Sequence, residues 1–251
     1  MYNKEIKLMT KHIKKAAKKF LSDFHVKKKA KGSFDFVTES DLACEKYLTK
    51  VIKKHFPKDN FLTEEFSHDA TLQDRTWIID PIDGTINFMQ GLPLFGIQMA
   101  FYDRGETQFA FIFLPRTNEF YFAQNGCGAY LNGKQIVVDK NVEMANTIVC
   151  TSDPKHNDAD YDFYFRFAKA VATKTLCIRM LGAACCSYSA VASSKVGAYV
   201  LVTNNEWDYM PGMFICKEAG AVCFSGTILS KKYNIACCNE NLGKFLVKNM
   251  K

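Results

Sequence analysis

The sequence lacks the segments that mark export or membrane insertion. None of its apolar runs approaches the roughly 20 residues that a membrane-spanning helix needs. The N-terminal stretch that begins Met1-Tyr2-Asn3 is rich in lysine and has no uninterrupted apolar core, so it is not typical of a secretory signal. These absences predict a soluble, cytoplasmic protein that does not engage a membrane.

The spacing that would make a zinc site from the ten cysteines is also missing. There is no C-x-x-C, and the five histidines do not lie near cysteines at ligand spacing. Cys185-Cys186 and Cys237-Cys238 are adjacent pairs in short apolar runs, where free thiols act as small buried hydrophobes. Reduced structural cysteines are favoured over disulfides. The Cys-x5-Arg loop of cysteine phosphatases and a phosphohistidine motif are both absent.

No Pro/Gly/Ser-rich linker and no internal repeat divides the 251 residues. With 48% hydrophobic and 24% charged residues, the composition is that of an ordinary globular protein. We therefore expect one domain over residues 1–251, with sub-domains of roughly 1–143 and 144–251.

Hydrophobic periodicity predicts helices first, then strands, then an alternation of both. An amphipathic helix is expected over about 3–24, followed by a basic loop at 25–34. A second helix is capped by Ser40 or Asp41 and stopped by Pro57. Asn132-Gly133 predicts a two-residue hairpin turn. Further strands are expected at 97–102, 108–113, 120–123, 147–151, 176–180 and 198–202, and further helices at 161–172, 183–195 and 207–219.

Most of the net charge of +7 comes from lysines in residues 11–19 and 27–31. A solvated helix face followed by a basic loop explains them, and a surface for nucleic acid or anionic lipid is the alternative. No aromatic residue interleaves with the second cluster, so that cluster offers no platform for base stacking.

The stretch Trp77-Ile78-Ile79-Asp80-Pro81-Ile82-Asp83-Gly84-Thr85-Ile86-Asn87-Phe88 is the most informative in the chain. It predicts a buried strand that ends in two carboxylates, followed by a turn that opens the next element. Two acids so close repel each other unless a cation lies between them, and oxygen-only ligands favour Mg²⁺ or Mn²⁺. Taken alone, the motif is equally compatible with an acidic surface turn.

Other acids also end short apolar segments. Glu64-Glu65 follows Phe61-Leu62, and Glu206-Trp207-Asp208 lies far downstream. Scattered acids of this kind are what a metal site assembled at strand ends requires.

Four motifs occur in the order found in the inositol monophosphatase family, which the chain therefore resembles. They are Asp-x-Val-Thr-x-x-Asp at 35–41, Glu64-Glu65, Asp-Pro-Ile-Asp-Gly-Thr-x-Asn-Phe at 80–88, and Trp207-Asp208 before Glu218-Ala219-Gly220. The resemblance covers about residues 35–220. It implies the layered α-β-α-β-α sandwich of the inositol monophosphatase and fructose-1,6-bisphosphatase type.

The resemblance implies a Mg²⁺-dependent, lithium-sensitive phosphomonoesterase. Two or three Mg²⁺ ions are expected, with Mn²⁺ as a substitute and Li⁺ and Ca²⁺ as inhibitors. By this resemblance, one metal is held by Glu64, Asp80 and the Ile82 carbonyl, and a second by Asp80, Asp83 and Asp208. The phosphate is faced by Asp83, Gly84, Thr85 and Asp208. Asp41 takes up a proton through the Thr85 hydroxyl.

The substrate end departs from the family pattern. Arg179, Gly182 and Ala183 match a family stretch that contacts the substrate, but Ala183 stands where a hydroxyl is usual. The family's inositol-contacting acid falls on Leu201, which weakens the case for inositol itself. Pro211 is expected in the first turn of its helix, and Met210 is expected to reshape the pocket floor.

Four substrate classes within the family stay open: inositol phosphates, fructose 1,6-bisphosphate, nicotinamide or adenosine phosphates such as NADP, and histidinol phosphate. Asn87-Phe88 and Gly91-Leu92-Pro93 favour the monophosphatase branch and a small cyclitol or sugar phosphate. A homodimer is implied by the resemblance. A binding role toward RNA or the transcription machinery on the same fold is the alternative of another class.

Overall fold

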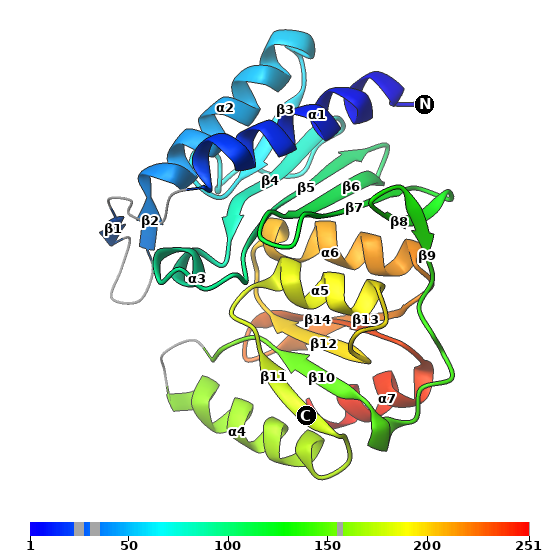
Figure 1. The fold of residues 1–251 in the computed structure, drawn as a ribbon. Coiled ribbons are helices and arrows are strands. Elements are labelled where there is room, and N and C mark those ends of the chain that lie inside the picture. The colour runs from blue at the N-terminus through cyan, green and yellow to red at the C-terminus, as the bar shows by residue number, and fades with distance from the viewer. Residues whose placement is uncertain (23–27, 31–35, 155–157, 251) are drawn as a thin grey trace.

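Five layers of alternating helices and sheets make up the computed structural model, which describes residues 1–22, 28–30, 36–154 and 158–250 (Figure 1). From one face to the other, the layers are helices α1 and α2, a seven-stranded sheet, helices α5 and α6, a five-stranded sheet, and helices α4 and α7. The expected α-β-α-β-α sandwich is confirmed.

The larger sheet has the strand order β3-β4-β5-β6-β7-β8-β9. Strands β3 and β4 are parallel, and every later neighbour is antiparallel. Its strands are β3 (Asn60–Thr63), β4 (Thr76–Asp83), β5 (Gly96–Asp103), β6 (Glu106–Leu114), β7 (Glu119–Gln124), β8 (Gly128–Leu131) and β9 (Lys134–Ile136).

The smaller sheet has the order β11-β10-β12-β14-β13, with β10 parallel to both of its neighbours. A separate pair, β1 (Lys28–Ala30) and β2 (Phe36–Thr38), is antiparallel. The strands of the smaller sheet are β10 (Ile148–Thr151), β11 (Cys177–Met180), β12 (Ala198–Val202), β13 (Val222–Ile228) and β14 (Lys231–Cys237).

Seven α-helices and one short 3₁₀ helix lie in the described residues. None of these helices is long and apolar enough to cross a bilayer. The helices are α1 (Asn3–Phe20), α2 (Glu39–His55), α3 (Thr85–Met89), η1 (Met144–Asn146), α4 (Asp158–Ala172), α5 (Ala184–Ala192), α6 (Glu206–Glu218) and α7 (Glu240–Asn249).

Two apolar cores hold the layers together. One lies between the two sheets and reaches α4 and α7, and the other lies between the larger sheet and helices α1 and α2. Met9 and Ile13 of α1 are fully buried in the second core, while the lysines of α1 are exposed. This one-sided burial is what the apolar spacing along α1 predicts.

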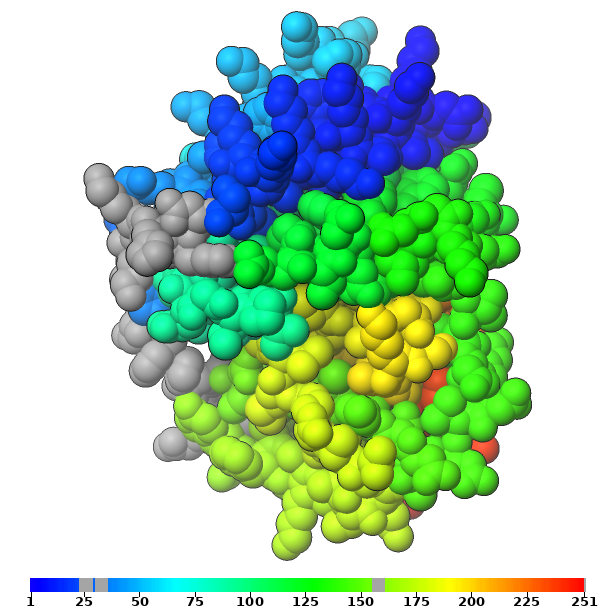
Figure 2. All heavy atoms as spheres, viewed as in Figure 1, coloured from blue at the N-terminus to red at the C-terminus, as the bar shows by residue number. Residues whose placement is uncertain are grey.

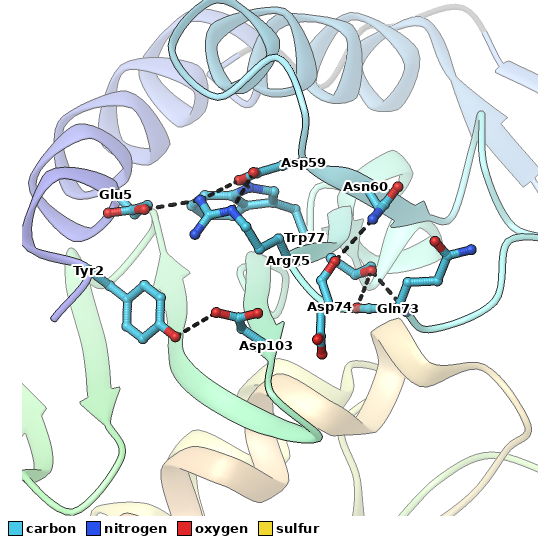
Figure 3. Close-up of polar contacts among 10 residues, drawn as sticks. Tyr2, Glu5, Asp59, Asn60, Gln73, Asp74, Arg75, Trp77 and Asp103 are labelled. Carbon is cyan, nitrogen blue, oxygen red and sulfur yellow. Dashed lines mark hydrogen bonds and ion pairs between the residues drawn. The ribbon is translucent and has the colours of Figure 1, made fainter.

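A polar network fastens α1 to the start of β4 (Figure 3). Arg75 donates to both carboxylate oxygens of Asp59, at 2.6 and 2.9 Å, and to Glu5 of α1 at 3.1 Å. The indole of Trp77 also donates to Asp59, at 2.8 Å. Asp59 is buried, so three charge-assisted hydrogen bonds replace the water that it loses. The network lies at the end of β4 opposite to Asp83.

The predicted helices and strands are largely confirmed, and the main differences are as follows. The first helix ends at Phe20, and the predicted helix at 183–195 ends at Ala192. Part of the expected basic loop at 25–34 is strand β1, and the rest of it lies outside the described residues. The apolar segments after 220 form a hairpin and an amphipathic helix, α7, neither of which was predicted from the sequence. The remaining difference is the N-cap of α2, which is neither Ser40 nor Asp41 but Thr38.

All ten cysteines lie in the described residues and are free thiols. Cys185, Cys186, Cys237 and Cys238 are buried in the core between the sheets, as small apolar side chains are.

Candidate active site

The central acidic motif lies at the end of β4, where that strand passes between the two cores. Asp80 pairs with Gln98 of β5 and Asp83 with Gly96, and the register shifts between the two pairs. Such a bulge re-aims side chains within a strand. The motif is buried strand rather than an acidic surface turn, because Asp80 is only 2% exposed.

Asp80 is surrounded by other acids. Burial raises its pKa well above the ordinary range, and the negative charges of Glu64, Asp83 and Asp208 raise it further. Its Oδ2 accepts a weak hydrogen bond from Gln98 at 3.4 Å, whereas Oδ1 is buried without any partner. A buried oxygen without a donor is costly, and a cation in the midst of these four carboxylates would satisfy it.

Asp83 caps the N-terminus of α5. Its carboxylate accepts the backbone N–H of Cys185, with Ala184 and Gly84 as further backbone donors. The N-cap residue of α5 is Ala183, which has no side-chain oxygen to do this. Burial raises the pKa of Asp83, and the N–H donors oppose that rise.

Asp208 lies in the first turn of α6. Its Oδ2 accepts hydrogen bonds from Thr203 Oγ1 at 2.8 Å and from Asn205 Nδ2 at 3.2 Å. Gln98 reaches the Asp208 carbonyl at 3.5 Å as well as Asp80, so one amide joins two acidic segments. Pro211 was expected in the first turn of its helix, but it lies further inside α6. Because proline has no N–H, the Trp207 carbonyl lacks its helical hydrogen-bond donor.

Glu64 follows β3, and its backbone N–H donates to Ile79 of the parallel strand β4 at 3.2 Å. The segment after it is held by Glu45, a fully buried carboxylate of α2. Glu45 accepts the hydroxyl of Thr63, the N–H of Glu65 at 2.9 Å and the N–H of Phe66 at 3.1 Å. Glu45 therefore fixes the chain on both sides of Glu64.

Asp41 and Thr85 are in contact, as the relay requires. The Thr85 hydroxyl lies 3.2 Å from Asp41 Oδ1 and 2.9 Å from the Ile82 carbonyl. Thr38 donates both its N–H, at 2.8 Å, and its hydroxyl to Asp41 Oδ2. Asp41 is thus the third residue of α2, closing a capping box with Thr38. Burial raises its pKa to about 6, although these hydrogen bonds lower it.

Within the described residues, no three His, Cys, Asp or Glu side chains come close enough in this conformation to hold a metal ion. Asp83 and Asp208 are each bonded to donors of the protein instead. The side chains around Asp80 nevertheless fit a hard cation, because their donor atoms are carboxylate oxygens. The neighbouring negative charges raise the pKa of Asp80, and its buried Oδ1 has no hydrogen-bond partner.

A pocket of about 260 Å³ opens beside these acids. It is lined by Asp83, Ile86, Thr151, Ser152, Asp153, Pro154, Gly182, Ala183, Ala184, Tyr199, Leu201, Val202, Thr203 and Asp208. Asp83 and Asp208 are 125 residues apart in the chain and meet here because α5 and α6 lie between the two sheets (Figure 1).

The pocket wall includes some of the residues predicted to contact substrate and not others. Gly182, Ala183 and Leu201 lie in its wall. Arg179 does not: it is exposed, and its guanidinium donates to the Ile178 carbonyl. Met210 does not form the pocket floor either, because it lines a separate hollow with Met213 and Asn234.

Two glycines bring the pocket wall close to the acidic motif. Gly84 has φ +87°, and a Cβ there would lie 2.8 Å from the Leu94 carbonyl oxygen and 2.9 Å from Ala183 Cβ. Gly182 has φ +66° and packs on Asn87, whose amide donates to the carbonyls of Leu94 and Leu181. Only glycine allows both this backbone and this approach.

Four polar residues of the site were not predicted from the sequence: Glu45, Gln98, Thr151 and Thr203. Glu45 and Gln98 face inward from a helix and a central strand, where polar residues are unusual, and this was the available signal. Thr151 is buried in the pocket wall with its hydroxyl unpartnered. Nothing in the local sequence distinguishes Thr151, at the end of β10, or Thr203, just after β12, from other threonines in such positions.

Known proteins resemble the chain over most of its length. The family model described as "Inositol monophosphatase family" matches residues 1–248. A Thermotoga maritima fructose-1,6-bisphosphatase/inositol-1-monophosphatase is 37% identical over 204 residues, which is 80% of this chain and 76% of that protein. The Nus factor SuhB of Escherichia coli is 31% identical over 242 residues, 94% of this chain and 90% of that protein. The solved structure of a Thermotoga maritima IMPase superposes with a TM-score of 0.88 and 31% identity, over 98% of this chain and 96% of that one.

Proposed function

Because the chain belongs to the inositol monophosphatase family, we propose that it is a Mg²⁺-dependent phosphomonoesterase acting on a small phosphorylated cyclitol or sugar. The observation that carries the proposal is the buried Asp80, which has one oxygen unpartnered and lies among the partly buried acids Glu64, Asp83 and Asp208. A buried carboxylate that faces three other acids destabilises a fold unless a cation balances the charge.

In this proposal, Glu64, Asp80 and the Ile82 carbonyl hold one ion, and Asp80, Asp83 and Asp208 hold another. Bound Mg²⁺ supplies polarisation of the phosphoryl oxygens, a more acidic water and charge neutralisation at the leaving oxygen. Thr85 would present its backbone N–H toward the phosphate, and Gly84 would do so once its N–H leaves the Asp83 carboxylate. Mn²⁺ substitutes for Mg²⁺, and Li⁺ and Ca²⁺ inhibit.

Asp41 serves as the general base through Thr85. Its contact with the Thr85 hydroxyl, at 3.2 Å, and its raised pKa of about 6 support this role. A carboxyl group with this pKa is ionised at pH 7 and still basic enough to take up a proton. The Thr38 bonds hold the carboxylate in one orientation.

The pocket favours a small substrate. Its volume of about 260 Å³ suits a monosaccharide or cyclitol phosphate better than a dinucleotide such as NADP. Leu201 and Ala183 remove two hydrogen-bonding positions from the wall, whereas Thr151 offers a free hydroxyl. Fructose 1,6-bisphosphate and histidinol phosphate remain candidates, together with inositol phosphates.

Phosphate release from a panel of these esters tests the proposal, with Mg²⁺, with EDTA, and with Mg²⁺ plus lithium. We expect release from one or two substrates that requires Mg²⁺ and falls with lithium.

Asp83→Asn should reduce turnover at least about 100-fold, because it removes a proposed metal ligand. Exposed Asp162→Asn on α4 is the matched control. Wild-type turnover by Asp83→Asn, or release that EDTA leaves unchanged, would refute the metal assignment.

A second role is suggested by the relatives named Nus factor SuhB. The observation that favours it here is charge: α1 and α2 expose eleven lysines, and Glu39 is their one exposed acid. A contact of this outer layer with RNA or the transcription machinery is compatible with catalysis, since the acidic group lies elsewhere. Salt-sensitive RNA retention that survives Asp83→Asn would separate the two roles.

A further inference from the structure

Two hollows run along one side of α1, where this helix lies over the outer face of the larger sheet. The first, of about 670 Å³, is lined by Thr10, Lys14, Asn118, Phe120, Phe122, Tyr130, Asn132 and Gly133. The second, of about 410 Å³, is lined by Lys14, Ala17, Lys18, Leu21, Ser22, Phe113, Pro115, Arg116 and Asn118. They share Lys14 and Asn118, so together they form one groove, which we call the α1 groove. Figure 2 shows α1 in blue across the molecule, with the green strands directly beneath it.

The floor of the α1 groove is aromatic. Phe122 and Tyr130 stack with ring centroids 6.5 Å apart and planes 30° apart, and both rings are half-buried. Phe120 lies deeper, with the Lys14 ammonium 4.9 Å from its ring centroid. These rings come from β7 and β8, more than 100 residues from the lysines in the chain. The fold therefore adds the stacking platform that the lysine-rich sequence lacks.

The walls of the α1 groove are basic. Lys14, Lys18 and Arg116 line it, and no lining residue in either hollow is acidic. Lys7 and Lys11 continue the same stripe along α1, because positions 7, 11, 14 and 18 recur on one helix face. The groove follows α1 from Thr10 to the end of the helix at Phe20, which is about 15 Å at 1.5 Å per residue, and continues to Ser22.

We propose that the α1 groove binds single-stranded nucleic acid, with bases stacked on Phe122 and Tyr130 and phosphates held by Lys14 and Lys18. The combination of half-exposed rings with a row of cations is what unpaired nucleotides require. This inference does not depend on phosphate hydrolysis, and it gives the binding role suggested above a defined site.

Other polyanions fit the groove less well. A bilayer would need apolar side chains that project outward, and none of the strongly exposed large apolar residues in the described part lines either hollow. A duplex keeps its bases stacked inside and would leave the aromatic floor unused.

Fluorescence anisotropy with a labelled, unstructured RNA of about 12 nucleotides tests the proposal, across salt concentrations of about 0.05 to 0.2 M. Lys14→Met combined with Lys18→Met should reduce the slope of log affinity against log salt by about 1.4, or 0.7 for each lost phosphate contact. Lys50→Met combined with Lys54→Met, two exposed lysines of α2, removes the same charge outside the groove and should leave the slope unchanged.

The aromatic floor is tested separately. Phe122→Leu combined with Tyr130→Leu should weaken binding about tenfold without changing the salt slope, because stacking is lost and phosphate contacts are kept. Tyr130→Phe keeps the ring and should bind like the unaltered protein. Circular dichroism and thermal unfolding of each variant report whether it is folded.

Three outcomes would overturn the proposal. The first is undiminished affinity in a folded Phe122→Leu, Tyr130→Leu variant. The second is an equal loss of salt slope in the α2 control, which would indicate a diffuse basic surface. The third is tighter binding to duplex RNA or to phosphatidylglycerol vesicles than to the single strand. None of these outcomes bears on the hydrolase proposal, which is tested by phosphate release.

Discussion

Individual side chains in this protein carry several functions at once. Asp83 ends β4, caps α5 and is the proposed ligand of a metal, while Asp41 closes the capping box of α2 and meets Thr85. Local stability and proposed chemistry therefore cannot be separated by simple deletion. Conservative substitutions that preserve hydrogen bonding are the informative ones.

The role proposed for Asp41 predicts how kcat depends on pH. Its folded-state pKa of about 6 lies above the ordinary value, so the carboxylate becomes protonated, and useless as a base, as the pH falls through about 6. We expect kcat to fall along this limb. Asp41→Asn should lower kcat about 100-fold or more and abolish the limb.

Thr85 supplies the control for this relay. Thr85→Ser keeps a hydroxyl and should retain most of the activity, whereas Thr85→Ala should lower kcat with little change in the Mg²⁺ requirement. An acidic limb that persists unchanged in Asp41→Asn would assign it to another group.

Glu45 is predicted to act on the metal site by holding the backbone around Glu64. Glu45→Gln replaces one carboxylate oxygen, which accepts a backbone N–H, by an amide NH₂ group that can only donate. The hydrogen bonds to Glu65 and Phe66 are therefore weakened, and the chain around Glu64 is held less firmly. We expect the Mg²⁺ concentration for half-maximal activity to rise about 10- to 100-fold, with a smaller change in kcat.

Glu39→Gln on the exposed start of the same helix is the matched control for Glu45→Gln. A Mg²⁺ dependence of Glu45→Gln identical to that of Glu39→Gln would argue that Glu45 is structural only.

Among the elements, β4 contributes to stability at one end and to the proposed active site at the other. Its first residues belong to the Arg75 network (Figure 3), and its last carry the acidic motif. Eight residues of strand separate the two ends by about 25 Å. Stability at one end and chemistry at the other should therefore respond to different mutations.

Arg75→Met tests this separation. The change leaves the buried Asp59 carboxylate without its main partner, and we expect a loss of about 2–3 kcal/mol in the free energy of unfolding. Turnover per folded molecule should stay unchanged. Denaturant unfolding measures the first quantity and phosphate release the second, with exposed Arg166→Met as the control. A loss below about 0.5 kcal/mol would mean that solvent replaces the guanidinium.

At the scale of the whole molecule, we expect the acids around Asp80 to couple stability to pH and to the proposed metal. The pKa values of Asp80 and Asp83 are raised in the folded state, so this state binds protons that the unfolded chain releases. Metal-free protein should therefore lose stability as the pH rises from about 4, the ordinary carboxyl value, through the raised folded-state pKa values.

Mg²⁺ should reverse that loss. At a concentration of about 100 times its dissociation constant it should contribute about 2.7 kcal/mol, or roughly 5–10 °C in Tm, at pH 8. At pH 5 the gain should be smaller, because protons compete for the same oxygens. Thermal unfolding with Mg²⁺, against NaCl of equal ionic strength, measures both. An equal gain in Asp83→Asn would place the ion elsewhere.

The amphipathic helices, the β5–β8 strands and the Asn132-Gly133 turn were predictable from local pattern, since burial on one face leaves a period in the sequence. The C-terminal helix α7 was missed because its apolar face is short. The N-cap of α2 was misplaced because Ser, Thr and Asp at 38–41 are all competent caps, and only the backbone decides among them.

The sequence by itself determined the family, the layered fold and the acidic motifs, because these depend on residue types at fixed short spacings. Tertiary structure alone decided which distant groups meet: Glu45 behind Glu64, Gln98 between Asp80 and Asp208, and Lys14 over the ring of Phe120. It also excluded Arg179 and Met210 from the pocket. The physical reason is that side-chain direction follows from strand register and helix packing, which no local spacing records.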